Sequence, residues 1–383
     1  SILNQKDFTR AKETIKFIKD KKWNSALKSA SKVKDREFRN LIDWMYLKTT
    51  RNGASFSEYK NFIEQNSEYP RINRIRFLAE GKIYLRNNSP TSIINWFDKY
   101  PPLGGMGKIK LAEAYLEKGQ TEKVQKLIKE GWETATISKN DLGYYRAKFK
   151  KFIDSEDHIR RADYLAWEKK YWDLKRMLKY LPKDQRALYN ARQILMSNSY
   201  GVDNAISKVP EYLKKDPGLE FDRLRWRNRR GRLEGSLEIL YRNSIKTEQQ
   251  MVRPDKWWEQ RESVVRSLIY KKRYKTAYKI SSEHALSAGP SFAEAEWLSG
   301  WIALTFLNSP EYAINHFQNF YNNVGYPISL ARGAYWLGAS YEKLNEKQLS
   351  NDFYSQAAEF PMTYYGQLAF NKINPGGNFE LKD

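Results

Sequence analysis

The feature that most constrains the fold is a helix pair that occurs twice in succession near the C-terminus. The first copy covers residues 292–324, and the second covers residues 331–361. In the first helix of the earlier copy, small and aromatic residues fall on one helical face, namely Ala293, Trp297, Gly300, Trp301 and Leu304. A helix pair that recurs after about 37 residues is typical of an α-solenoid, in which each pair packs on the next.

The second helix of each copy also carries one apolar face. This face is formed by Ala313, Phe317, Phe320 and Val324 in the first copy and by Leu349, Phe353 and Ala357 in the second. Ser309 followed by Pro310 predicts a helix start, because the serine oxygen can accept a backbone N–H and proline has none to lose. Pro361 is expected to end the last of these helices.

Short polar turns of the same kind precede candidate second helices in the rest of the chain. They lie at residues 20–23, 86–90, 117–121, 168–172, 197–201, 228–232 and 271–273. No long segment alternates like a strand. Aromatic residues make up 15% of the chain and supply large side chains for helix packing. We therefore predict an all-α fold, an α-superhelix of stacked helix pairs.

The sequence offers no convincing catalytic, cofactor or metal site. Cysteine is absent, which excludes disulfides and thiolate ligands. His158, His284 and His316 are far apart, so we expect no metal site. The glycine cluster at residues 104–108 lacks the Ser or Thr of a phosphate loop and is interpreted as a turn. The longest nearly apolar run, at residues 297–307, is shorter than the ~20 residues of a transmembrane helix. We expect no cofactor and no membrane span.

The chain is strongly basic, with 67 Lys and Arg against 45 Asp and Glu and a net charge of +22. The densest basic segment surrounds Trp226 and contains Arg223, Arg225, Arg227, Arg229, Arg230 and Arg232. Arginines among aromatic residues can bind carboxylates or phosphates. They can equally form a solvated helix end that pairs with surface carboxylates. No recognised DNA- or RNA-binding motif accompanies them, so we do not expect a nucleic-acid partner.

Five ordered segments of the C-terminal half resemble the α-superhelical domain of bacterial soluble lytic murein transglycosylases. They read LRWRNRRGRLEGSLEIL (224–240), PDKWWEQR (254–261), FAEAEWLSGWIAL (292–304), PISLARGAYWLGASYEKL (327–344) and FPMTYYGQLAF (360–370). The resemblance rests on their order and spacing over about 150 residues, because each segment alone could occur in an ordinary helix pair. Residues 1–220 are compatible with this family but less distinctive.

The resemblance implies a periplasmic location and a role in cutting peptidoglycan. Members cleave the MurNAc–GlcNAc bond and form a 1,6-anhydro-muramyl end. Their superhelix curls into a ring, and the catalytic glutamate lies in a lysozyme-like domain that follows it. That glutamate belongs to a Glu-Ser pair followed by a Gly-Leu-Met-Gln stretch. Here Glu262-Ser263 is followed by VVRSLIY inside the repeat region, so we assign it no catalytic role.

We therefore predict a superhelical domain at residues 1–370 and, at residues 371–383, the start of a linker to a catalytic region outside this sequence. Tyr364, Tyr365 and Gln367 form the candidate docking segment for that region. The predicted function is to support and position the murein strand and the catalytic domain, with no activity of the isolated chain. The expected partners are peptidoglycan and the catalytic domain. The alternative is a tetratricopeptide-like adaptor that binds a protein partner.

Overall fold

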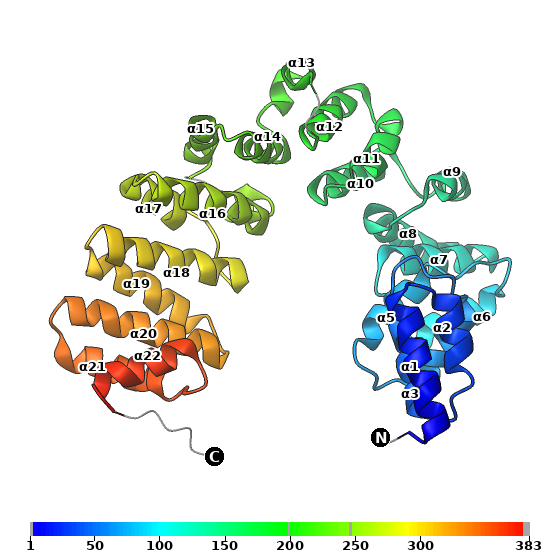
Figure 1. The fold of residues 1–383 in the computed structure, drawn as a ribbon. Coiled ribbons are helices and arrows are strands. Elements are labelled where there is room, and N and C mark those ends of the chain that lie inside the picture. The colour runs from blue at the N-terminus through cyan, green and yellow to red at the C-terminus, as the bar shows by residue number, and fades with distance from the viewer. Residues whose placement is uncertain (1–2, 198–199, 245–246, 378–383) are drawn as a thin grey trace. The chain divides into compact units, whose positions relative to one another are not determined.

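The computed structural model describes residues 3–197, 200–244 and 247–377, and these contain helices and turns but no strand (Figure 1). The predicted all-α class is confirmed. The chain divides into two compact units, residues 1–189 and 190–383. Within the described residues, helices pack mainly on their neighbours one or two elements away in sequence, as expected for a solenoid. Curling of the helix pairs into a ring stays a prediction.

The first unit begins with a run of short helices. They are α1 (Gln5–Lys19), α2 (Trp23–Ala30), α3 (Arg36–Leu47), α4 (Phe56–Gln65), α5 (Ile72–Glu80), α6 (Pro90–Lys99), α7 (Gly105–Glu117), α8 (Thr121–Thr134), α9 (Lys139–Lys148), α10 (Ser155–Trp167) and α11 (Tyr171–Met177). A short 3₁₀ turn at Leu178–Tyr180 follows, and α12 (Lys183–Leu195) spans the boundary between the units. Aromatic residues such as Phe56 and Trp96 fill the core of this unit, with their rings edge to face at 5.3 Å.

The remaining helices, both long and short, lie in the second unit. They are α13 (Val202–Ser207), α14 (Pro217–Arg229), α15 (Leu233–Asn243), α16 (Pro254–Tyr270), α17 (Tyr274–Ser282), α18 (Gly289–Phe306), α19 (Pro310–Asn322), α20 (Pro327–Lys343), α21 (Lys347–Ala358) and α22 (Tyr364–Ile373). Single 3₁₀ turns lie at Glu211–Leu213 and Gln249–Met251. None of the helices in the described segments is long and apolar enough to cross a bilayer.

One turn geometry recurs between paired helices. The residue with positive φ is Lys21, Gly119, Lys169, Gly231, Lys272 or Asn345, with φ between 58° and 70°. The next residue donates its backbone N–H to the carbonyl five residues earlier, as Gln120 does to Tyr115 at 3.0 Å. This is the Schellman arrangement, which satisfies a helix end and starts the next helix almost at once. The predicted turns at these places are confirmed; the turn at 197–201 includes residues 198–199, which lie outside the described residues.

The two C-terminal helix pairs are confirmed as α18 with α19 and α20 with α21. Two details of the sequence interpretation were wrong. Ser309 occupies the N-cap position of α19, but its hydroxyl donates to the Leu307 carbonyl at 3.2 Å instead of accepting an N–H. Leu349 is 42% exposed, and Ser350 and Tyr354 are buried in its place.

The shift of the α21 face has a physical cause at Gly338 on α20. A Cβ at this glycine would lie 2.8 Å from the Tyr354 ring, so the ring packs directly on the backbone of α20. Ser350 also donates its hydroxyl hydrogen to the Gly338 carbonyl at 2.9 Å. These two contacts place Ser350 and Tyr354 against α20, while Ala357 of the predicted face stays buried and Phe353 still packs on the neighbouring core. The predicted domain boundary at 370/371 lies within α22, and residues 378–383 lie outside the described residues.

Candidate functional site

Two arginines of the basic segment serve contacts within the second unit. Arg225 on α14 is buried, and its guanidinium lies 3.1 Å from the Asp222 carboxylate. Arg227 donates to the Gly235 carbonyl and pairs with Glu238 at 3.1 Å. Arg227 therefore joins α14 to α15, whereas Arg225 pairs within α14. Both contacts show the carboxylate-pairing role that the sequence left open for part of the segment.

Two further arginines of the segment, Arg223 at the middle of α14 and Arg229 at its C-terminal end, also lie on this helix. Arg229 donates to the carbonyls of Leu195 and Met196 at 2.6 and 3.1 Å, and so covers the C-terminal end of α12. Arg223 is half-buried, and burial lowers the pKa of its guanidinium. Binding of an anion by these side chains stays a prediction.

The last two arginines of the segment lie against an aromatic ring. The guanidinium groups of Arg230 and Arg232 are 5.2 and 4.8 Å from the centroid of the Trp226 ring. Arg232 also lines a pocket of about 170 Å³ between the α14–α15 turn and α16, which we call the Arg232 pocket. Its lining consists of Asn228, Gly231, Arg232, Leu233, Ser263, Val264, Ser267 and Lys271. Sequence reasoning did not connect Arg232 with Lys271, because the two belong to different helices.

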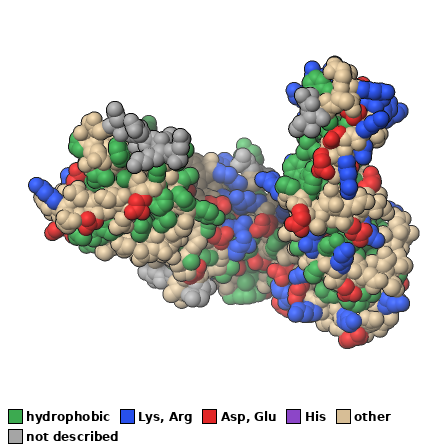
Figure 2. All heavy atoms as spheres, turned by 90° about the horizontal axis from the view of Figure 1, so that it is seen from below, with side chains coloured by type: hydrophobic (Ala, Val, Ile, Leu, Met, Phe, Trp, Pro, Cys, Tyr) green, Lys and Arg blue, Asp and Glu red, His purple; other side chains and the backbone are tan. Residues whose placement is uncertain are grey.

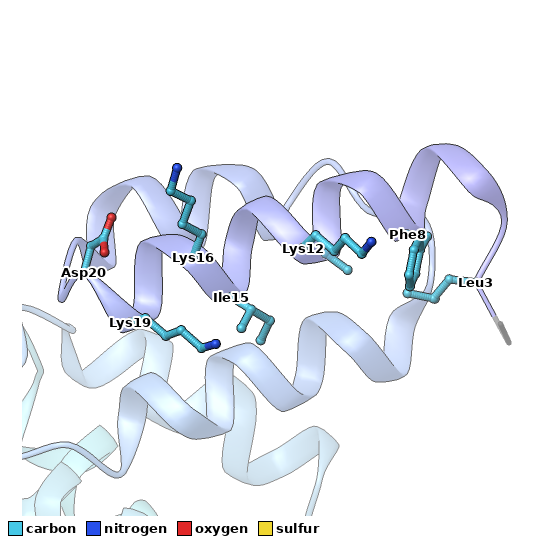
Figure 3. Close-up of a pocket in the computed structure, with 8 residues that line it drawn as sticks. Leu3, Phe8, Lys12, Ile15, Lys16, Lys19 and Asp20 are labelled. Atoms are coloured by element: carbon cyan, nitrogen blue, oxygen red, sulfur yellow. The ribbon is translucent and has the colours of Figure 1, made fainter.

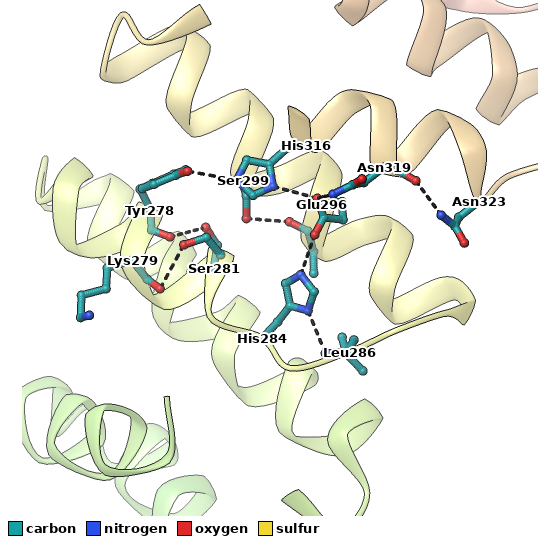
Figure 4. Close-up of polar contacts among 12 residues, drawn as sticks. Tyr278, Lys279, Ser281, His284, Leu286, Glu296, Ser299, His316, Asn319 and Asn323 are labelled. Atoms are coloured by element: carbon teal, nitrogen blue, oxygen red, sulfur yellow. Dashed lines mark hydrogen bonds and ion pairs between the residues drawn. The ribbon is translucent and has the colours of Figure 1, made fainter. Parts of the chain in front are cut away.

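A buried carboxylate–imidazole cluster lies where α17, α18 and α19 meet (Figure 4). Glu296 on α18 contacts His284 Nε2 through one oxygen at 2.9 Å. Its other oxygen contacts His316 Nδ1 at 2.8 Å and accepts from the Asn319 amide at 3.1 Å. The Leu286 N–H donates to His284 Nδ1 at 3.0 Å, so Nε2 carries the proton that His284 donates to Glu296.

From the sequence, His284 and His316 were considered as possible metal ligands, and this cluster was missed. The two histidines lie 12 and 20 residues from Glu296, so no local spacing brings the three together. Burial raises the pKa of the Glu296 carboxyl, but the hydrogen bonds from His284 and His316 outweigh it and lower the pKa to about 2. A general acid needs a raised pKa, so Glu296 acts as an ionised link between helices. In the described segments, no group of three or more potential ligands has the arrangement of a metal site.

The glycine cluster at residues 104–108 was interpreted as a turn, but Gly104 is the N-cap and residues 105–108 are the first turn of α7. This helix start holds an internal carboxylate. Glu80 accepts hydrogen bonds from the backbone N–H groups of Leu103 and Gly104. A Cβ at Gly107 would lie 2.5 Å from the carboxyl carbon of Glu80, so only glycine leaves room for this contact. The N-terminal end of α7 is therefore occupied by the chain's own carboxylate, as a helix dipole favours.

Two other acidic residues were considered as possible general acids. Glu262 on α16 pairs with Arg266 on the same helix at 2.6 Å and is a surface ion pair. Asp43 on α3 lines a pocket of about 260 Å³ together with Glu58 on α4. Burial first, and then the charge of Glu58, raises the pKa of Asp43. This is the direction that a general acid needs, so Asp43 is the residue to control for in any activity assay.

The candidate docking segment lies on α22. Thr363 caps the helix by accepting from the Gly366 N–H at 3.0 Å. Tyr364 is 69% exposed, whereas the ring of Tyr365 packs 5.3 Å from that of Tyr335. Gln367 is exposed, and its amide donates to the Pro361 carbonyl at 3.1 Å. Tyr364 and Gln367 are thus accessible, and docking of another domain there stays a prediction.

An apolar groove runs along α1, with Leu3, Phe8 and Ile15 on its floor and Lys12 and Lys16 beside them (Figure 3). The ammonium of Lys12 lies 4.5 Å from the centroid of the Phe8 ring. On the face shown in Figure 2, basic side chains lie among acidic ones and form no continuous basic surface.

The fold is similar to that of the 70-kDa soluble lytic transglycosylase. The structure of that enzyme in complex with bulgecin A matches with a TM-score of 0.50 and 12% identity, over 98% of this chain and 59% of that chain. The structure of SLT70 from Escherichia coli matches with a TM-score of 0.47 and 14% identity, again over 98% and 59%. No protein-family model matches the chain, and no curated protein matches its sequence. The chain spans about three fifths of the length of the transglycosylase, and the resemblance predicted from the sequence is confirmed for the fold.

Proposed function

We propose that the chain is the non-catalytic superhelical part of a soluble lytic murein transglycosylase, and that it supports and positions the murein strand and the catalytic domain in the periplasm. The observation that carries this proposal is the likeness in fold to the 70-kDa enzyme over 98% of this chain. The five ordered sequence segments of the C-terminal half also support it.

The contacts made by three of the described carboxylates support a non-catalytic role. Glu296 is ionised and saturated with hydrogen bonds, and Glu80 is held by backbone N–H groups. Glu262 is paired with Arg266 at the surface. In this proposal the reactive glutamate belongs to a catalytic domain outside the sequence, and the superhelix contributes binding and orientation. Positioning of a substrate is a substantial part of catalysis, because it removes the entropy cost of bringing reactants together.

The positive charge supplies the means of holding murein, whose stem peptides carry carboxylates. With a net charge of +22, the chain should be attracted to an anionic polymer at low ionic strength. The range of this attraction falls from about 30 Å at 0.01 M salt to about 8 Å at 0.15 M. Sedimentation with purified sacculi tests the proposal. We expect the chain to co-sediment at low salt and to dissociate as salt rises.

The matched control uses sacculi from which an amidase has removed the stem peptides. Binding should fall sharply on this material if peptide carboxylates are the ligands. Absence of binding to intact sacculi at low salt would contradict the proposal and favour the tetratricopeptide-like adaptor.

The isolated chain should release no anhydro-muropeptides from murein. Chromatography of the soluble products checks this expectation, with lysozyme-treated murein as the positive control for digestion. Release that is abolished by Asp43→Asn would overturn the non-catalytic assignment and would place the reaction in the pocket between α3 and α4.

A further inference from the structure

The Arg232 pocket combines cations and hydroxyl groups from two neighbouring helices. Arg232 is the N-cap residue of α15, and Lys271 is the C-cap residue of α16. Ser263 and Ser267 lie four residues apart on α16 and therefore share one helical face. Leu233 and Val264 provide apolar lining. The pocket thus offers two positive charges and two hydroxyl groups to one small ligand.

The cations of this pocket have no acidic partner in the described part of the chain. Neither Arg232 nor Lys271 forms an ion pair there, and no carboxylate lines the pocket. The acidic residues nearest in sequence are engaged elsewhere. Glu234 pairs with Arg273, and Glu262 pairs with Arg266. An anionic ligand would therefore meet uncompensated positive charge.

The serine hydroxyls are also available for a ligand. Other serines in helices of this unit donate to the carbonyl four residues earlier, as Ser236, Ser299 and Ser340 do. Among the described residues, Ser263 and Ser267 form no such side-chain hydrogen bond, and Ser263 is exposed. Each hydroxyl can therefore donate its hydrogen to a ligand. Two such donors beside two cations can bind the oxygen atoms of an anion.

The side chain of Arg232 is exposed, but one contact and a defined backbone turn restrict it. Its guanidinium lies 4.8 Å from the centroid of the Trp226 ring, within the range of a cation–π contact. Its backbone N–H bonds to the Arg227 carbonyl at 3.0 Å in the Schellman turn. Less side-chain entropy is lost on binding when a side chain is held in this way.

We propose that the Arg232 pocket binds a free carboxylate of a peptide, and that in murein this is a carboxylate of the stem peptide. The second part of the inference rests on the proposed function. The planar guanidinium can donate two parallel hydrogen bonds to a carboxylate, Lys271 adds a point charge, and the two serines donate to the remaining lone pairs. The positive end of the α15 dipole, next to Arg232, favours the same anion.

Isothermal titration calorimetry with the 383-residue chain tests this inference. The ligand is a soluble murein disaccharide-pentapeptide, and its matched probe is the same molecule with its carboxylates amidated. We expect saturable binding of the acid and at least tenfold weaker binding of the amide. Acetate and inorganic phosphate are titrated in parallel. Tighter binding of phosphate than of the muropeptide would overturn the assignment to a carboxylate.

Variants identify the pocket as the site. Arg232→Gln and Lys271→Gln should each weaken binding about tenfold, because each removes a hydrogen bond to a charged group. Ser263→Ala with Ser267→Ala should weaken it several-fold without a change in net charge. Lys275→Gln, which removes the same charge from an exposed site on α17, should leave binding unchanged. Circular dichroism confirms that each variant is folded.

The outcomes separate this inference from the proposed function. If the muropeptide does not bind, or binds equally well to the pocket variants and to Lys275→Gln, the inference is wrong, although sedimentation with sacculi can still support the proposed function. If acetate binding depends on Arg232 and Lys271 but the chain binds neither sacculi nor the muropeptide, the assignment to murein is wrong.

Discussion

Gly107 shows how a single residue sets the packing of the first unit. Its missing side chain lets the Glu80 carboxylate reach the start of α7. We expect Gly107→Ala to lower the free energy of unfolding by about 1–3 kcal/mol, the usual cost of overpacking. Urea denaturation measures the effect.

The matched control is Gly143→Ala on α9, where an added Cβ would meet nothing within 4 Å. This change should raise stability by about 0.5–1 kcal/mol, because alanine is the better helix former. Equal effects of the two substitutions would show that the contact at Gly107 does not constrain the chain.

Glu296 gives a pH dependence with a defined sign. Its pKa is about 2 in the folded chain against 4.5 for an ordinary glutamate. The ionised carboxylate therefore contributes stability above pH 4.5, and this contribution is lost as the pH falls toward 2. It amounts to about 3 kcal/mol. We expect the difference in unfolding free energy between the wild type and Glu296→Gln to shrink by this order between pH 5 and pH 2, as measured by urea denaturation. A difference that does not vary with pH would refute this account.

The contacts around Gly107 and Glu296 could be predicted from the sequence only in part. The sequence indicated a turn at residues 104–108 but gave no sign that Glu80 binds there, because the two segments are joined only by the packing of α5 on α7. The histidines beside Glu296 were visible as residues, but their meeting depends on three separate elements. Arg225 and Arg227 were candidate ligand contacts, and local carboxylates proved to engage both.

At the scale of elements, the Schellman turns differ in backbone strain, because some have a non-glycine residue at the position with positive φ. Lys169 has φ of 58° in the turn between α10 and α11, whereas Gly119 has φ of 70° in the corresponding turn between α7 and α8. A side chain in this region costs about 1–2 kcal/mol, and glycine loses part of that gain through its greater freedom when unfolded. Lys169→Gly should therefore stabilise the chain by about 0.5–1 kcal/mol.

The reciprocal change, Gly119→Ala, should destabilise by a similar amount, and thermal unfolding compares the two. Opposite signs are the expected result. Destabilisation by Lys169→Gly would mean that the lysine side chain contributes more than its backbone strain costs.

The helix pairs themselves were predictable, because polar turns and apolar spacing are local properties of the chain. Which face of a helix is buried was less predictable. Leu349 fitted the apolar pattern of α21, yet Gly338 on the neighbouring helix draws Ser350 and Tyr354 inward instead. A face predicted from one helix alone cannot include the shape of the surface on which it packs.

At the scale of the whole molecule, the contacts of the described residues are local. Helices pack mainly on elements one or two steps away in sequence, so stability should approximate a sum over neighbouring pairs. The fold class was predictable for this reason, since each pair repeats a local plan. The Arg232 pocket was not, because Lys271 joins it only through the packing of α16 on α14 and α15.

Local packing predicts that the two units open independently. Gly107→Ala destabilises the first unit, and Glu296→Gln destabilises the second. Each variant therefore tests one unit separately. Hydrogen exchange followed by mass spectrometry should show faster exchange in peptides from α5 to α8 for the first variant and from α16 to α20 for the second. Each variant should leave the peptides of the other unit at wild-type rates, because a destabilised neighbour pair transmits little to distant pairs. Faster exchange throughout the chain in both variants would instead mean that the chain unfolds as one cooperative body.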